Sequence, residues 1–121
     1  MRFMVLVKAS KNSEAGMMPT QELLADMGQF NEQLIKAGVL LAGEGLQATS
    51  KEARVRFDGD KRNIAYGPFP ETNQLIAGFW VWKCNSLEEA IAWAKRCPDP
   101  MPGERAELEI RQLFEAEDFL A

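Results

Sequence analysis

Apolar residues recur along this chain with two different periods, and together these predict strands and helices in a regular order. Four segments alternate or run apolar in the manner of strands, namely residues 2–9, 39–42, 76–83 and 106–114. Two segments place apolar residues three and four positions apart, as amphipathic helices do: residues 19–37 and residues 86–97. The order is strand, helix, strand, an inserted hairpin, then strand, helix, strand.

The insert begins with a half-exposed strand, because apolar and charged residues alternate over residues 53–58. The Asp58-Gly59 pair predicts a turn, and the polar residues that follow predict a loop longer than two residues before a return strand at residues 63–65. Residues 65–72 come next and contain two prolines and a glycine. Such a segment cannot continue a ladder of hydrogen bonds, so we expect a shaped loop there and a polar loop at residues 10–18.

This order is that of a split βαβ, ferredoxin-like domain of the α+β class, with a hairpin inserted and one domain over residues 1–121. Helices cover one face of the sheet in such a fold. Both faces of residues 2–9 are nevertheless apolar, with Met4 and Leu6 opposite the core side, so both should be buried. We therefore expect a homodimer in which two sheets pack face to face.

Charge and composition argue against several classes of function, namely nucleic-acid binding, membrane insertion and metal binding. The 121 residues include 14 basic and 18 acidic ones without a basic cluster, which argues against a nucleic-acid partner. Apolar runs fall short of the roughly 20 residues of a membrane span, so we expect no membrane partner. Histidine is absent and Cys84 and Cys97 lack metal-ligand spacing, so we expect neither a metal site nor a cofactor. Residues 1–7 do not form a signal-like start, which favours the cytoplasm.

Several motifs, in order along the chain, resemble the YCII-related family, also called DGPF-domain proteins: Gly43-Glu44-Gly45-Leu46-Gln47, Gly67-Pro68-Phe69-Pro70-Glu71-Thr72, Leu87-Glu88-Glu89-Ala90 and Glu109-Ile110-Arg111. The likeness extends from residue 1 to about residue 114. It implies a dimeric α/β barrel, similar to muconolactone isomerase and small monooxygenases, and no settled activity. It also implies association with extracytoplasmic-function sigma factors. Tyr66 stands where the family usually has an Asp.

Three residues are candidates for catalysis. Glu44 lies between two glycines at a strand end, where a carboxylate can act as a general base. Tyr66 and Arg111 could stabilise a developing oxyanion. The structural alternative is that Glu44 pairs with Arg54, Arg56 or Arg111.

A second set of residues is proposed for ligand binding, because a shaped loop can line a cleft and Lys8, on the strand face of Met4 and Leu6, can point into the space between the sheets: Lys8, Gly67, Pro68, Phe69, Glu71 and Thr72. The structural alternative is that these side chains fill gaps, cap turns or lie in solvent. The sequence favours a dimeric small-molecule-binding or accessory protein with a small anionic ligand. The alternatives are an isomerase or lyase that uses Glu44, Tyr66 and Arg111, and a regulatory partner of a sigma factor.

Overall fold

The computed structural model describes residues 1–71 and 73–120. The main elements occur in the predicted order: β1 (Arg2–Lys8), α2 (Gln21–Lys36), β2 (Leu40–Gly45), β5 (Ile76–Lys83), α3 (Leu87–Lys95) and β6 (Leu108–Gln112). Between them lie α1 (Lys11–Glu14), a 3-10 turn (Thr49–Lys51), β3 (Ala53–Asp58) and β4 (Lys61–Tyr66), and a second 3-10 turn (Ala116–Phe119) follows β6.

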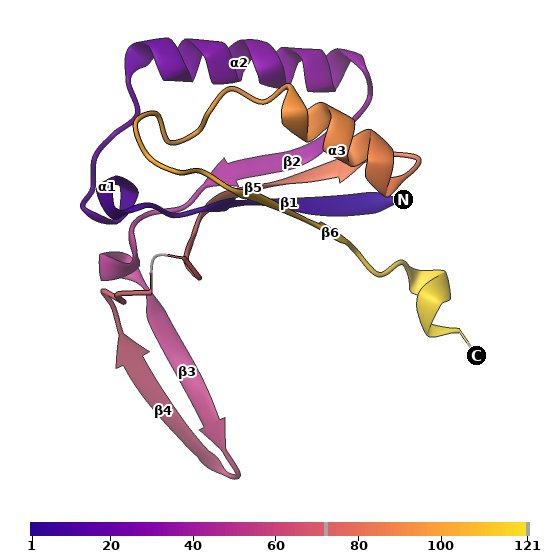
Figure 1. Cartoon of the computed structure of the whole chain (residues 1–121). Helices are drawn as coiled ribbons and strands as arrows, with labels where there is room; N and C mark the ends of the chain where they lie inside the picture. The colour runs from indigo at the N-terminus through magenta and orange to yellow at the C-terminus, as the bar shows by residue number, and fades with distance from the viewer. Residues whose placement is uncertain (72, 121) are drawn as a thin grey trace.

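The four-stranded sheet has the strand order β2-β5-β1-β6, and all its pairs are antiparallel. α2 and α3 both lie on one side of this sheet (Figure 1). Strands from the two halves interleave, since β5 inserts between β1 and β2. This topology confirms the predicted ferredoxin-like α+β fold.

The core lies between the helices and the sheet. Phe3 and Trp82 are paired neighbours on β1 and β5, and both are fully buried. Phe30 of α2 packs edge-on against Trp80 and Trp82, with ring centroids 6.0 and 6.2 Å away. Burial of a side chain such as Phe3 or Leu34 stabilises the fold by about 1.5–3 kcal/mol. The aromatic strand β5 is therefore central, as its sequence predicts.

The helix ends follow capping chemistry. The Thr20 hydroxyl accepts a hydrogen bond from the backbone N–H of Leu23 at 3.1 Å and begins α2. Gly38 has a φ of 73°, a left-handed conformation that ends the same helix. The Ser86 hydroxyl accepts from the N–H of Glu89 at 3.1 Å and begins α3. These local signals explain why both helices were predictable.

The other face of the sheet carries no helix in the described residues (Figure 1). Met4 is paired with Val81 and Leu6 with Phe79, so these four side chains share that open face. All four are half-buried, whereas Val5 on the helix side is fully buried. Within one chain, the prediction that both faces of β1 are buried is therefore correct only for the face that the helices cover. The open face is half-buried.

β3 and β4 form a separate two-stranded sheet that projects away from the helices (Figure 1). Asp58 pairs with Lys61, so the hairpin loop has two residues, Gly59 and Asp60. The predicted longer loop is wrong. Gly59 has a φ of 60°, which allows the tight turn, and the polar residues after it continue as an exposed strand.

Three predicted boundaries need correction. The expected loop at residues 10–18 contains α1, which begins where Ser10 and Ser13 cap each other. β2 continues through Gly45, because Gly43 to Gly45 pair with Trp80 to Gly78 of β5. β6 is shorter than residues 106–114, since it pairs with β1 over five residues.

Candidate functional site

A surface hollow of about 360 Å³ lies where β1 ends. It is lined by Lys8, Ala9, Asn73, Arg105, Ala106 and Glu107. These residues come from the end of β1, the loop before β5 and the segment before β6. Three segments far apart in the sequence therefore meet at one place, and two of their side chains are cationic.

The charges around this hollow are not fully compensated. The Lys8 Nζ lies 3.2 Å from Glu109 Oε1, and its side chain is 18% exposed. Glu107 lines the hollow, and its carbonyl oxygen accepts a hydrogen bond from the Lys8 N–H at 3.1 Å. Within residues 1–71 and 73–120, Arg105 forms no ion pair. The hollow thus combines an available guanidinium with an ammonium whose partner is half-exposed.

Thr49, which is 3% exposed, lies under the loop at residues 67–70 and holds it in place through hydrogen bonds. The Phe69 N–H donates to Thr49 Oγ1 at 3.0 Å, and the Thr49 hydroxyl and N–H both donate to the carboxylate of Glu14. The Gly67 N–H donates to the carbonyl oxygen of Glu52 at 2.9 Å. Thr49 and Glu14 therefore position this loop, and sequence reasoning did not identify either of them.

Gly67 is required here for a steric reason. A Cβ added at this position would overlap the carbonyl oxygen of Thr49, a backbone atom that cannot move aside cheaply. The half-buried ring of Phe69 is covered by Arg54, whose guanidinium carbon lies 3.6 Å from the ring centroid. Arg54 also pairs with Glu52 at 2.8 Å. Pro68 and Glu71 are exposed. Thr72 lies outside the described residues.

The three candidate catalytic residues are not brought together within one chain. Glu44 pairs with Phe79 on edge strand β2, whereas Arg111 lies on β6 at the opposite edge. Three strand spacings separate those edges, a distance of about 14 Å. Tyr66 ends β4 in the other sheet and is 75% exposed.

The structural alternative for Glu44 is wrong for the described residues, where this carboxylate forms no ion pair. Arg54 pairs with Glu52, and Arg111 lies 3.9 Å from Glu109.

The glycine before Glu44 has a packing role. A Cβ at Gly43 would lie 2.6 Å from Cδ1 of Trp80, so the indole occupies that space rather than a ligand.

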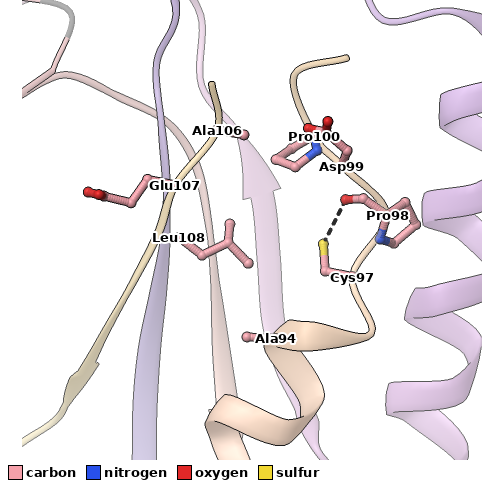
Figure 2. A pocket seen from close by; sticks show the side chains of 8 residues that line it. All are labelled: Ala94, Cys97, Pro98, Asp99, Pro100, Ala106, Glu107 and Leu108. Carbon is pink, nitrogen blue, oxygen red and sulfur yellow. Dashed lines mark hydrogen bonds between the residues drawn. The ribbon is translucent and has the colours of Figure 1, made fainter. Parts of the chain in front are cut away.

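A second hollow of about 270 Å³ lies between the end of α3 and the start of β6 (Figure 2). Its one thiol, Cys97, donates to the carbonyl oxygen of Pro98 at 3.2 Å. Burial, with a smaller contribution from the Asp99 carboxylate, raises the pKa of Cys97 to about 11. The thiol is therefore protonated at neutral pH and is a poor nucleophile.

Sequence reasoning missed Arg105 and Asn73 as well as Thr49. Arg105 stands within an acidic run, residues 104–109, which has the composition of a solvated surface. Its relation to Lys8 arises from the antiparallel pairing of β1 with β6, which places the segment before β6 beside the end of β1. The pairing order β1-β6 of a ferredoxin-like sheet is the one sequence signal that could have suggested this.

Comparison with known proteins identifies the class to which this fold and sequence belong. The family model for the YCII-related domain matches residues 1–114, so the chain belongs to the YCII-related family. It is also similar to an uncharacterized protein of Rhizobium meliloti (strain 1021), with 27% identity over 93 residues that cover 77% of this chain and 74% of the relative. The family assignment made from the motifs is confirmed, and the function of the relative is not established.

Over residues 1–71 and 73–120, no helix combines the length and the apolar character needed to cross a membrane. Within the same ranges, Cys, Asp and Glu side chains do not gather in groups of three that could hold a metal ion.

Proposed function

We propose that this YCII-related protein binds a small carboxylate-bearing molecule in the hollow between Lys8, Arg105 and Asn73. One observation carries the proposal: two cationic side chains and an amide from three separate segments line one hollow of about 360 Å³. Ligand sites are typically concave and contain a few convergent polar groups. A guanidinium can hold a carboxylate through two parallel hydrogen bonds.

The ion pair between Lys8 and Glu109 is compatible with this role. The Glu109 side chain is 36% exposed and can be hydrated when it separates from Lys8, so a ligand carboxylate can replace it as the partner of Lys8. Glu107 in the same hollow offers a hydrogen-bond acceptor. The preferred ligand would therefore carry a hydroxyl or amino group beside its carboxylate.

A panel of small carboxylates, hydroxycarboxylates and amino acids, screened by thermal shift and then by calorimetry, tests the proposal. We expect Lys8→Met and Arg105→Gln each to weaken binding by about tenfold or more, since each removes a charged hydrogen bond. Lys36→Met on α2 is the matched control, because Lys36 is exposed at the far end of a helix. Equal affinity in all three variants, or a lack of binding by the whole panel, would contradict the proposal.

We further propose that two copies of the chain pair through the open face of the sheet. The half-buried side chains of Met4, Leu6, Phe79 and Val81 support this, because they form a contiguous apolar strip on a face without helices. Leu6→Glu should yield monomers by light scattering. Leu24→Glu, on the exposed side of α2, is the control that should leave the mass unchanged.

The alternatives have less support. An isomerase or lyase would need Glu44 and Arg111 to reach one substrate from opposite edges of the sheet. The sigma-factor association stays a prediction. A cytoplasmic location remains part of the proposal, supported by two cysteines that are both present as thiols.

A further inference from the structure

We infer that the β3–β4 hairpin is an arm that grips a second copy of this chain. The inference rests on the proposed dimer and extends it to a surface that the sheet contact does not include. The hairpin projects from the molecule on the side of the sheet away from α2 and α3 (Figure 1). An isolated two-stranded hairpin is marginally stable in water, so an arm of this kind needs a covering partner.

One face of the arm is apolar and exposed. Cross-strand pairing places Val55 opposite Ile64 and Phe57 opposite Arg62 on this face. Val55, Ile64 and Phe57 are 52%, 58% and 72% exposed, and Tyr66 on the same face is 75% exposed. A run of large apolar side chains on one face of a ribbon marks an interaction surface.

The apolar face points away from the arm's own supporting loop. Arg54 and Arg56 lie on the opposite face, because side chains alternate across a strand. The guanidinium of Arg54 covers the ring of Phe69, which fixes the polar face toward the loop at the base. The apolar face must therefore be covered by something other than residues 67–70.

Hydrogen bonds at the base of the arm fix its orientation before it binds a partner. The Gly67 N–H donates to the carbonyl oxygen of Glu52, which joins the two ends of the hairpin. Phe69 is bound in turn to the buried Thr49. A preorganised arm loses less conformational freedom on binding than a flexible one, and this favours association.

Charge favours a second copy of the chain as the partner. Residues 53–66 contain four basic and two acidic residues, whereas the rest of the chain contains 10 basic and 16 acidic ones. The arm as a whole is thus positively charged and is attracted to the acidic body of an identical chain, and Arg62 brings one of its four basic residues to the apolar face. The two-fold symmetry of a dimer would give each body one arm, so the contact is made twice.

The length of the arm fits the same geometry. Strands of six residues extend about 20 Å, and two packed sheets lie about 10 Å apart. An arm that leaves one sheet toward the open side can therefore cross the gap between two facing sheets. About 10 Å of arm remains to lie along the partner.

Hydrogen exchange on the unmodified protein tests this without any variant. Backbone amides of residues 54–65 should exchange more slowly as protein concentration rises through the dimer dissociation constant. Exchange that does not depend on concentration would overturn the inference. Protection that appears only after another macromolecule is added would also overturn it, because the arm would then have a different partner.

A pair of variants separates the arm from the sheet contact. Phe57→Asp should raise the dimer dissociation constant by about tenfold or more in light scattering, whereas Asn63→Asp on the polar face should change it about threefold or less. If Leu6→Glu dissociates the dimer and Phe57→Asp does not, the sheet dimer stands and the arm inference fails. If Phe57→Asp dissociates it and Leu6→Glu does not, the arm is the interface and the sheet proposal fails.

Discussion

The hydroxyl of Thr49 accepts a hydrogen bond from the backbone N–H of Phe69 at 3.0 Å and donates one to Glu14. This buried side chain joins the segment after β1, the turn after β2 and the loop after β4. It thus fixes the loop to which the hairpin is attached. The Gly67-Pro68-Phe69 motif is therefore held in place by the side chain of Thr49, a residue outside the motif.

Replacement of Thr49 by Val keeps the shape of the side chain and removes both hydrogen bonds. We expect Thr49→Val to lower the free energy of unfolding by about 1–3 kcal/mol, because buried donors and acceptors lose their partners. Urea denaturation measures this, and faster exchange of the Phe69 amide would accompany it. Ser50→Ala, at the exposed neighbouring position, should leave both quantities unchanged.

The glycines of β2 provide a second matched pair. Gly43→Ala would place a Cβ 2.6 Å from Trp80 Cδ1, whereas a Cβ at Gly45 meets no atom within 4 Å. We expect Gly43→Ala to destabilise the protein by about 1–3 kcal/mol through overpacking. Gly45→Ala should change stability by about 0.5 kcal/mol or less. Equal effects of the two changes in thermal denaturation would contradict this account of Gly43.

Gly28 lies inside α2 on an exposed surface, and a Cβ there meets no atom within 4 Å. Gly28→Ala should therefore raise the unfolding free energy by about 0.5–1 kcal/mol, since alanine restricts the unfolded chain and favours helix. Gly38→Ala is the contrasting control, because its φ of 73° strains an L-residue. A loss of stability in Gly28→Ala would show that α2 packs against something outside the chain.

The thiol of Cys97 should respond to pH in a defined direction. Burial and the Asp99 carboxylate raise its pKa from 9.0 to about 11, so the folded state favours the protonated thiol. The resulting stability is fully present below pH 9 and is lost as pH rises toward about 11. Alkylation by iodoacetamide in a Cys84→Ala background should show a midpoint near the raised value, and Asp99→Asn should lower it. A midpoint near 9 would contradict the burial of Cys97.

The elements of the sheet were predictable because their signals are local. The apolar and aromatic residues of β5 indicate a strand that is covered on both faces, which predicts a central position in the sheet. Thr20, Gly38 and Ser86 mark the helix ends. The four-residue helix α1 was not predictable, since one turn has no periodicity. The two-residue hairpin loop was missed because an arm exposed on both faces carries the same polar residues as a loop.

The candidate site was predictable in part. Lys8 was expected to point into the space between two sheets, and it lines a hollow together with Asn73, which follows the shaped loop of residues 65–72. Arg105 and Thr49 could not be found from the sequence, because their roles arise from contacts with segments distant along the chain. Periodicity and motifs describe what lies near in sequence, and the hollow is made by what lies near in space.

The sheet order also determines when the fold can form during synthesis. β1 precedes the other strands of this sheet along the chain, and its two neighbours are β5 and β6. Residues 9–75 must be made before β5 begins, which takes on the order of several seconds at about 5–20 residues per second. Throughout that interval the apolar strand β1 lacks the partners that it will have in the sheet, so neither of its edges is paired until β5 has been made.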